Sequence, residues 1–280
     1  SAYNWWNECL HGVARAGVAT VFPQSIGMAA SFDDSLLFDV ATAISDEARA
    51  KYNEYKTQGF TDAYQGLTFW SPNINIFRDP RWGRGHETYG EDPFLTSRLG
   101  VHFIKGLQGD GEYMKAAACA KHFPGHGDTK ADSHNGTAKS YKTWKKMKKC
   151  EMIPFKRGIE SGADMVMVAH IKTPLASRDG LPASLSSTWI TERLRGELGF
   201  DGVVITDAMG MKALSSSYTS LETSLMAIEA GVDILLMPHD FTKTFDELVS
   251  AVESGKISES RIDESVARIL KMKSGFKKIN

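Results

Sequence analysis

Short apolar runs with few charged residues alternate along this chain with longer amphipathic stretches. The runs predict strands at 67–77, 116–123, 164–170, 202–206 and 232–237, with less regular extended segments at 3–8 and 20–22. The amphipathic stretches predict helices at 33–56, 92–106, 141–161, 188–198, 220–230, 241–254 and 258–273. Because the strands are continuously apolar, both faces of the sheet should be covered. The pattern therefore predicts an α/β fold with parallel strands.

The position of the polar residues favours a closed barrel over an open sheet. They gather just after the carboxyl ends of the predicted strands, and no glycine-rich phosphate fingerprint follows the first strand. Six strand–helix units are visible in the sequence, whereas a full barrel has eight. We therefore expect one domain over residues 1–280, a (β/α)8-type TIM barrel that lacks the first one or two units. Such a barrel exposes sheet edges and apolar faces, which predicts a homodimer or a complementing N-terminal fragment.

Composition and charge exclude several classes of protein. Hydrophobic residues make up 42% and charged residues 24%, which is ordinary for a folded globular chain. The formal net charge of -1 provides no field that recruits nucleic acid or an anionic membrane surface, and no apolar stretch is long enough to span a bilayer. Cys9, Cys119 and Cys150 form neither a disulfide framework nor a metal-ligand spacing. Reduced cysteines and the lack of an opening signal segment predict a cytoplasmic location.

The densest cluster of reactive side chains follows the predicted strand at 116–123. Residues 121–129 read Lys-His-Phe-Pro-Gly-His-Gly-Asp-Thr, and Asp132, Ser133 and His134 come soon after. Three interpretations remain open: a polar loop held by its own hydrogen bonds, a metal site, and acid–base catalysis. The spacing matches no standard metal motif, so we predict no metal and no cofactor. In the catalytic interpretation Asp132 fixes the tautomer of His134, which can donate and recover a proton near neutrality.

Asp207 is the second candidate. It stands at the end of the apolar run 202–206, where packing alone does not explain a carboxylate. In a barrel this position points into the catalytic mouth, and an aspartate there can act as nucleophile or base. The alternative is a side chain that caps the following helix.

A third group combines charge with aromatic bulk. Arg84 and Glu87 lie close to Trp82, and Glu8 follows Trp5 and Trp6. Arginine offers a planar fork of donors and tryptophan a face for stacking, which suits a hydroxyl-rich ligand. An ordinary surface ion pair is the alternative for Arg84 and Glu87. The lysine-rich segment 139–149 steps at helical spacing and indicates a solvated helix face, not a nucleic-acid site.

These motifs resemble glycoside hydrolase family 3 over almost the whole chain, with two branches represented. Residues 3–122 resemble the β-xylosidase/β-glucosidase branch through the motifs at 3–8, 11–15, 80–85 and 87–93. Residues 121–280 resemble the bacterial β-N-acetylglucosaminidase branch through 121–129, 132–134 and 202–209. The junction near 115–125 predicts a natural mosaic or an engineered chimera.

The resemblance implies a retaining β-glycosidase. Asp207 matches the family's nucleophile and His134 the acid/base of the hexosaminidase branch, with Asp132 as its partner. Lys121, His122 and Arg84 match ligands of sugar hydroxyls, and Glu8 matches a carboxylate that grips distal hydroxyls.

Three hypotheses follow for the function. The first is a retaining exo-β-glycosidase, with β-N-acetylglucosaminides ahead of β-xylosides and β-glucosides because the acid/base loop follows that branch. The second is a carbohydrate-binding or scaffold barrel with little turnover. The third is a metal-dependent hydrolase that uses the His/Asp loop.

Overall fold

The structure is a computed structural model, and it describes residues 3–134 and 136–276. Its central sheet is parallel, in the order β1 (Thr68–Phe69), β2 (Ala117–Phe123), β4 (Met165–Val168) and β6 (Val203–Thr206). A bridge between Ile205 and Ile234 adds a further parallel position beside β6. Parallel strands that neighbour each other in chain order are typical of a TIM-barrel type α/β fold. The described residues do not include the pairing that would close the ring.

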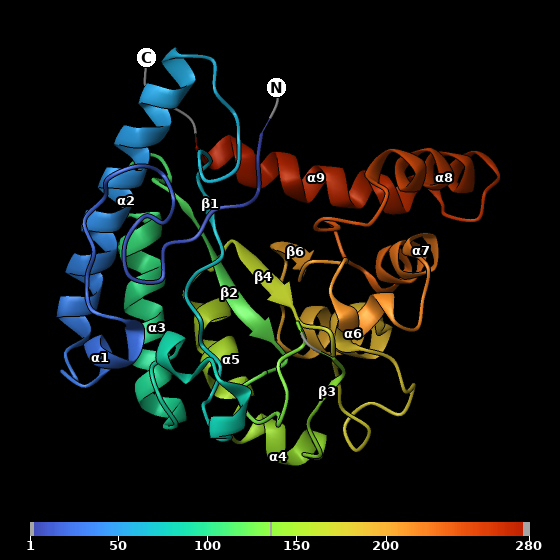
Figure 1. The fold of residues 1–280 in the computed structure, drawn as a ribbon, viewed down its shortest axis with the longest axis horizontal. Coiled ribbons are helices and arrows are strands. Elements are labelled where there is room, and N and C mark those ends of the chain that lie inside the picture. Colours follow the sequence, from blue (N-terminus) through green and yellow to red (C-terminus); the bar gives the residue numbers. More distant parts are fainter. Residues whose placement is uncertain (1–2, 135, 277–280) are drawn as a thin grey trace.

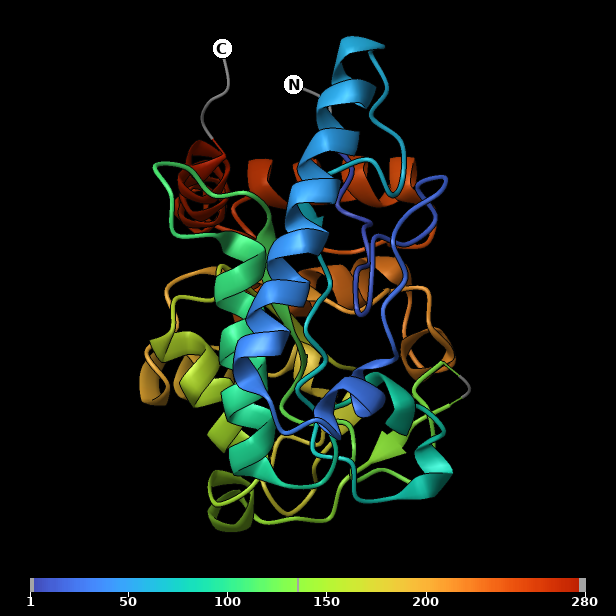
Figure 2. The same cartoon turned by 90° about the vertical axis from the view of Figure 1, so that its left-hand side faces the viewer.

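Helices cover the outside of this sheet. In Figure 1, α2 and α3 lie to one side of the strands while α9 and α8 lie across the top, and Figure 2 shows α2 and α3 running alongside each other. The helical segments are α1 (Ser25–Ala29), α2 (Asp34–Thr57), η1 (Pro80–Trp82), η2 (Gly85–Glu87), α3 (Pro93–Gln108), α4 (Trp144–Lys148), α5 (Met152–Glu160), η3 (Ala183–Leu185), the π-helical η4 (Thr188–Glu197), α6 (Lys212–Ser215), α7 (Ser220–Ala230), α8 (Phe241–Glu253) and α9 (Glu259–Gly275). A separate pair of short strands, β3 (Ala138–Lys139) and β5 (Ile171–Lys172), lies beyond the carboxyl ends of β2 and β4.

Alternation along the strands divides the core into two layers. Met165 and Met167 of β4 pack with Ile205 of β6 in a cluster on the inner side of the sheet. Val166 of β4 and Val204 of β6 belong to a larger cluster that includes the helices. All of these side chains are buried. The sheet is therefore covered on both faces, as the continuous apolar runs predict.

Residues 3–8 take the position beside β1 without forming a regular strand. The backbone N–H of Trp70 donates to the carbonyl of Asn7 at 3.0 Å, and the N–H of Tyr64 donates to the carbonyl of Trp6 at 2.7 Å. The Asn7 side chain also accepts from Gly66 N–H at 2.7 Å. These bonds place Glu8 at the same edge of the sheet as the end of β2.

The structure corrects four of the predicted elements. The predicted strand 232–237 contributes only the bridge at Ile234, because the N–H of Leu236 donates to the Thr206 hydroxyl at 3.0 Å instead of to a backbone carbonyl. Only Thr68–Phe69 of the predicted strand 67–77 is regular, because Pro72 has no N–H for the ladder. Residues 20–22 form no strand in the described chain. The predicted helix 141–161 is two helices, α4 and α5, because Pro154 has no N–H for the Cys150 carbonyl and its ring would clash with it.

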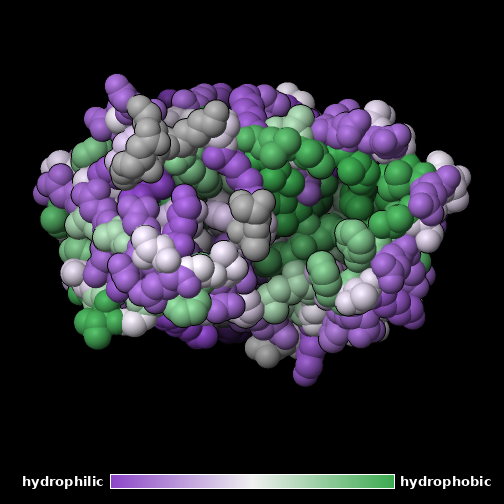
Figure 3. Space-filling view, turned by 90° about the horizontal axis from the view of Figure 1, so that it is seen from above, coloured by the Kyte–Doolittle hydropathy of each residue, from purple (hydrophilic) through white to green (hydrophobic). Residues whose placement is uncertain are grey.

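No helix within residues 3–134 and 136–276 is long and apolar enough to cross a membrane. Seen from above, a hollowed apolar area lies over the side of the molecule where Figure 1 places α8 (Figure 3). Phe241 and Phe245 of α8 and Leu270 of α9 are exposed large apolar side chains. The described chain therefore leaves part of these two helices uncovered.

Candidate active site

One cavity of about 470 Å³ lies at the carboxyl ends of β2, β4 and β6. Six of the seven side chains singled out from the sequence line it: Glu8, Arg84, Lys121, His122, His134 and Asp207. The seventh, Asp132, stands behind His134. The remaining lining residues are Trp6, Ala14, Arg15, Tyr64, Trp70, Met167, Ala208 and Met237. Residues that are far apart in the sequence thus meet where barrel folds place their chemistry.

Asp207 is held by backbone contacts at the end of β6. Its N–H donates to the carbonyl of Val168 at 2.9 Å, and its Oδ1 accepts from Ala208 N–H at 2.9 Å. The side chain is 7% exposed, and its Oδ2 is buried without a hydrogen-bond partner among the described residues. The capping interpretation is wrong, because the following helix α6 begins at Lys212, after Met211, and Asp207 does not bond to its first turn. Oδ2 therefore has no partner among the described residues at the wall of the cavity.

A buried histidine, which was not singled out from the sequence, supports the residue after Asp207. His170 donates from Nε2 to the carbonyl of Ala208 at 2.9 Å, and its Nδ1 accepts from the Ser184 hydroxyl at 2.7 Å. Burial lowers the pKa of His170 below its ordinary value. The imidazole is therefore a neutral support for the turn that carries Asp207.

Asp132 and His134 form the dyad that their spacing predicts. His134 Nδ1 lies 2.7 Å from Asp132 Oδ1, and that oxygen also accepts from His134 N–H at 3.2 Å. The hydrogen bond to Asp132 raises the pKa of His134 above its ordinary value, against the opposing effect of burial. Burial alone would raise the pKa of Asp132, but the bonds from His134 outweigh it and lower that pKa to about 2. With Nδ1 committed to Asp132, Nε2 is the nitrogen that can exchange a proton in the cavity.

Two neighbouring residues of β2 reach the same cavity because the strand register shifts between Lys121 and Phe123. Lys121 is buried and lies 3.2 Å from Glu8 Oε2. His122 Nδ1 accepts from the Asn75 side-chain amide at 2.9 Å, which leaves Nε2 as an N–H donor. Burial lowers the pKa of His122 well below its ordinary range. The cavity wall therefore presents a cation and a neutral donor.

Arg84 and Glu87 form a partly buried fork, not an exposed surface pair. Arg84 Nε and Nη2 donate to the two oxygens of Glu87 at 2.8 and 2.7 Å, and Asn73 donates to Glu87 at 3.2 Å. Arg84 Nη1 is buried and has no partner in the described structure. Trp82 lies against Arg84 and stacks on His126, so this tryptophan supports the wall and does not face a ligand.

The unpartnered polar atoms of the lining indicate what the cavity can bind. Arg84 Nη1 and Trp70 Nε1 are donors, and Asp207 Oδ2 is an acceptor. Apolar surface from Trp6 and Met167 adjoins them. A ligand that carries several hydroxyl groups and an apolar ring face matches this combination.

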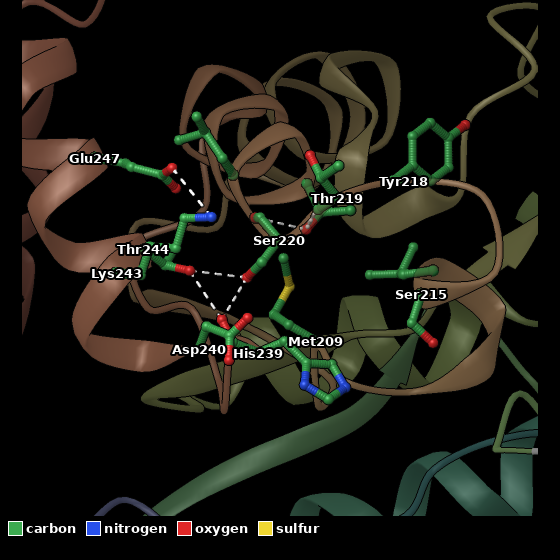
Figure 4. A pocket seen from close by; sticks show the side chains of 13 residues that line it. Met209, Ser215, Tyr218, Thr219, Ser220, His239, Asp240, Lys243, Thr244 and Glu247 are labelled. Atoms are coloured by element: carbon green, nitrogen blue, oxygen red, sulfur yellow. Dashed lines mark hydrogen bonds and ion pairs between the residues drawn. The ribbon is translucent and has the colours of Figure 1, made fainter.

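A second cavity of about 520 Å³ lies beyond the turn after Asp207, between α7 and α8. Figure 4 shows Ser220 and Thr244 pointing toward each other and toward His239. Both hydroxyls donate to the His239 carbonyl, at 2.7 and 2.8 Å, and Lys243 lies 3.9 Å from Glu247. No side chain predicted from the sequence lines this cavity. Because the hydroxyls of Ser220 and Thr244 are already bonded, this cavity is the weaker candidate for a polar ligand.

The His/Asp loop does not form a metal site in the described residues. His126 Nδ1 lies 2.9 Å from Thr129 Oγ1, and its Nε2 lies 2.8 Å from Ser133 Oγ, so both ring nitrogens are bonded. No group of three or more His, Cys, Asp or Glu side chains in residues 3–134 and 136–276 is placed to hold a metal ion. A metal-dependent hydrolase has no ligand set there.

Several lining residues were not singled out from the sequence. Arg15 lies in one of the family-like motifs but carried no role, and its guanidinium lies over the Tyr64 ring at 5.6 Å. Tyr64 and Met237 carry no sequence signal, since each reaches the cavity from an irregular segment in the left-handed backbone region. Trp70 is an apolar residue in a predicted strand, where a buried packing role is the ordinary interpretation.

The model of the glycosyl hydrolase family 3 N-terminal domain matches residues 4–272. The chain is 38% identical over 274 residues to a xylan 1,4-beta-xylosidase from Xylanibacter ruminicola, covering 95% of this chain and 31% of that protein. It is 34% identical over 288 residues to beta-D-xylosidase 1 of Arabidopsis thaliana, covering 96% of this chain and 35% of that protein. The chain thus spans about a third of the length of these curated relatives.

A solved structure of a glycoside hydrolase family 3 beta-N-acetylglucosaminidase from a Paenibacillus species superposes with a TM-score of 0.81 at 34% identity. The alignment covers 98% of this chain and 51% of that one. Proteins named for both branches are therefore among the similar proteins, in agreement with the two-branch resemblance seen in the sequence.

Proposed function

This chain belongs to glycosyl hydrolase family 3, and we propose that it is the catalytic barrel of a retaining exo-β-glycosidase. The observation that carries the proposal is the pairing, on one cavity, of the unpartnered Asp207 Oδ2 with the Asp132–His134 dyad. One group can attack a sugar ring and the other can protonate a leaving oxygen. We further propose that the parallel sheet is part of a (β/α)8 ring.

Asp207 Oδ2 attacks the anomeric carbon while the protonated His134 gives its Nε2 proton to the glycosidic oxygen. The bond to the aglycone breaks, the aglycone leaves as an alcohol, and a glycosyl–Asp207 ester remains. His134, now neutral, then accepts a proton from water as the water oxygen attacks the same carbon. The ester bond breaks, Asp207 regains its charge, and the two inversions give net retention.

Charge explains why a histidine can serve where most such enzymes use a second carboxylate. Two carboxylates in one pocket repel each other, which raises the cost of ionising both. A His134 that is cationic before the first step and neutral after it places no second negative charge near Asp207. The bond to Asp132, which raises the pKa of His134, keeps more of the acid form present near neutrality.

The other lining side chains bind the sugar in this proposal. The Glu8–Lys121 pair, the N–H of His122 Nε2 and Arg84 Nη1 take its hydroxyl groups. The planes of Trp6 and Trp70 stack at 5.7 Å and border the cavity as an apolar wall. A compact site of this kind suits a single terminal sugar.

β-N-Acetylglucosaminides are the proposed substrates, because the acid/base is a His–Asp dyad on a loop that resembles that branch. β-Xylosides are the second candidate, supported by the identity to proteins named xylosidases and by Glu8, which comes from that half of the chain. We propose that a junction near residues 115–125 joins the two halves.

The test is hydrolysis of aryl β-glycosides of N-acetylglucosamine, xylose and glucose by the full chain, with Asp207→Asn as the control. We expect turnover of one sugar that disappears in the control and releases the β-anomer first. Turnover that survives in Asp207→Asn would contradict the nucleophile assignment. No turnover by a folded sample, together with saturable binding of the same sugars, would favour the carbohydrate-binding or scaffold hypothesis.

A further inference from the structure

The loop that carries Asp132 and His134 begins with a firmly anchored part, residues 124–129. The Gly127 carbonyl accepts from the backbone N–H groups of Arg78 and Asp79 at 2.8 and 3.1 Å. Asn75 Oδ1 accepts from His126 N–H at 2.7 Å. A side chain at Gly127 would lie 2.1 Å from the Ile76 carbonyl oxygen, so this contact requires glycine. The first part of the loop is thus bound to the segment that follows β1.

A partly buried ion-pair network fixes the same part from the other side. Lys142 Nζ lies 3.5 Å from Asp128 and contacts Glu151, which is almost fully buried at the start of α5. Ser140 Oγ donates to Asp128 at 3.3 Å. Asp128 is therefore held by two side chains, Lys142 and Ser140, on this side of the loop.

The second part of the loop, residues 130–134, is more exposed, and the side chain of His134 is 51% exposed. Its contacts with the first part are few. Thr129 Oγ1 donates to the carbonyl of Ala131 at 2.9 Å, and His126 Nε2 lies 2.8 Å from Ser133 Oγ. Ser133 is fully buried and directly precedes His134. The His126–Ser133 bond is therefore the side-chain link closest to the acid/base.

The hydrogen-bond pattern determines the tautomer of His126. The single hydroxyl proton of Thr129 is used toward the backbone carbonyls of His126 and Ala131, so Thr129 Oγ1 accepts from His126 Nδ1–H. Nε2 then accepts from the Ser133 hydroxyl. Burial lowers the pKa of His126 to about 4, so the ring stays neutral near neutrality.

We propose that His126 is a positioning residue for acid/base catalysis: through Ser133 it fixes where the exposed Asp132–His134 pair stands relative to Asp207. His126 does not line the cavity and does not touch the sugar site. The inference rests on the proposed function for its kinetic consequence, but the link itself is a property of the loop. A histidine that only stabilised the fold would leave the balance between attack and protonation unchanged.

The test compares two serines that bond to buried imidazoles on opposite sides of the cavity. Ser133→Ala removes the hydroxyl that His126 holds, and Ser184→Ala removes the matching hydroxyl at His170. Ser133→Thr restores a hydroxyl. The readout is the ratio of kcat/KM for an aryl glycoside with a good leaving group to kcat/KM for an alkyl glycoside of the same sugar.

We expect Ser133→Ala to raise this ratio by about 10- to 100-fold, because a displaced acid slows mainly the substrate that needs protonation. Ser133→Thr should return the ratio toward the parent value, and Ser184→Ala should leave it within about 3-fold, since it disturbs attack alike for both substrates. Equal losses on both substrates in Ser133→Ala would overturn the proposal.

A second measurement does not depend on turnover. The backbone N–H of His134, which donates to Asp132 Oδ1 at 3.2 Å, should exchange about 10-fold or more faster in Ser133→Ala and in His126→Asn, while residues 203–206 stay protected. In Ser184→Ala this N–H should exchange as in the parent chain. Unchanged exchange of this N–H in a folded Ser133→Ala protein overturns the link. If the parent chain hydrolyses no glycoside while this exchange accelerates in the variants, the proposed function fails and the link to Ser133 stands.

Discussion

The two sides of the cavity hold their reactive groups by different means. Asp207 extends a buried strand, and backbone hydrogen bonds to β4 continue through the residue itself. His134 stands on an irregular loop, and side-chain bonds from Asp132 and, through Ser133, from His126 hold it in place. The Asp207 side inherits its geometry from the sheet, whereas the His134 side depends on a few polar contacts.

Both sides nevertheless contain a similar arrangement of a buried histidine and a serine. A fully buried histidine with a lowered pKa accepts a serine hydroxyl on one nitrogen and donates from the other, His170 near Asp207 and His126 near His134. The difference lies in what the histidine supports. His170 adds one bond to a strand end that is already ordered, whereas His126 is the main side-chain link to its part of the loop. Changes on the loop should therefore alter protonation selectively.

The largest effect should come from Asp207. Asp207→Asn puts an amide nitrogen in place of the oxygen that we propose attacks the sugar, and we expect kcat to fall by about 10⁴-fold or more for every aryl or alkyl glycoside. The amide oxygen can still accept from Ala208 N–H, so the thermal midpoint should stay close to that of the parent chain.

Azide rescue of a second variant, Asp207→Gly, provides the control for the role of Asp207. With Asp207→Gly, added azide should restore turnover and give a glycosyl azide of inverted configuration, because one displacement replaces two. A β-glycosyl azide from this variant would contradict the assignment of Asp207.

His134→Ala should have the next largest effect, and a selective one. We expect kcat/KM for alkyl glycosides to fall by about 10²- to 10⁴-fold, with a loss of about 10-fold or less for dinitrophenyl glycosides, whose leaving group needs little protonation. The measurement is kcat/KM over a series of leaving groups. An equal loss of kcat/KM for every leaving group would indicate a structural role for His134. The proposed difference between the Asp207 side and the His134 side would then be wrong.

The pH profile should separate Asp132 from His134. Asp132 raises the pKa of His134, so the protonated acid persists to higher pH in the parent chain. Asp132→Asn removes the charge, lowers that pKa and should move the basic limb of kcat/KM to lower pH, with a loss of about 10-fold for alkyl glycosides above neutrality. A basic limb that stays in place would show that another group gives the proton.

The smallest effect should come from the strand that precedes Asp207. Ile205→Val removes one buried methyl group from β6 and should lower the free energy of unfolding by about 1 kcal/mol. We expect kcat/KM to change by less than about 3-fold, and equally for aryl and alkyl substrates, because the backbone bonds of β6 remain. Denaturant unfolding and the leaving-group ratio check the two expectations. If Ile205→Val changed the ratio of aryl to alkyl kcat/KM as Ser133→Ala is expected to, the Asp207 side and the His134 side would not act independently.

The sequence predicts the three central strands better than it predicts the edge strands 67–77 and 232–237 or the segments between the strands. Residues 116–123, 164–170 and 202–206 are identified as strands because a strand that is buried on both faces consists mostly of consecutive apolar residues. The division of 141–161 into α4 and α5 was missed although Pro154 marks it, because the lysine spacing around it suits one long helix. His170 was missed because a single histidine after an apolar run has no partner nearby in the sequence, and Ser184 joins it only in the fold.

The sequence by itself determines the parallel α/β pattern, the chemistry of the loop at 121–134 and the carboxylate at the end of the 202–206 run, since these are properties of short segments. The tertiary structure decides that Glu8, Arg84, Lys121, His134 and Asp207 share one cavity, and which of their atoms remain unpartnered. The spacing of residues in the sequence does not give their distance in the folded chain, because the sheet brings the carboxyl ends of separate strands to one edge. Burial lowers the pKa of His122 and the hydrogen bond to Asp132 raises the pKa of His134, and both causes exist only once the chain has folded.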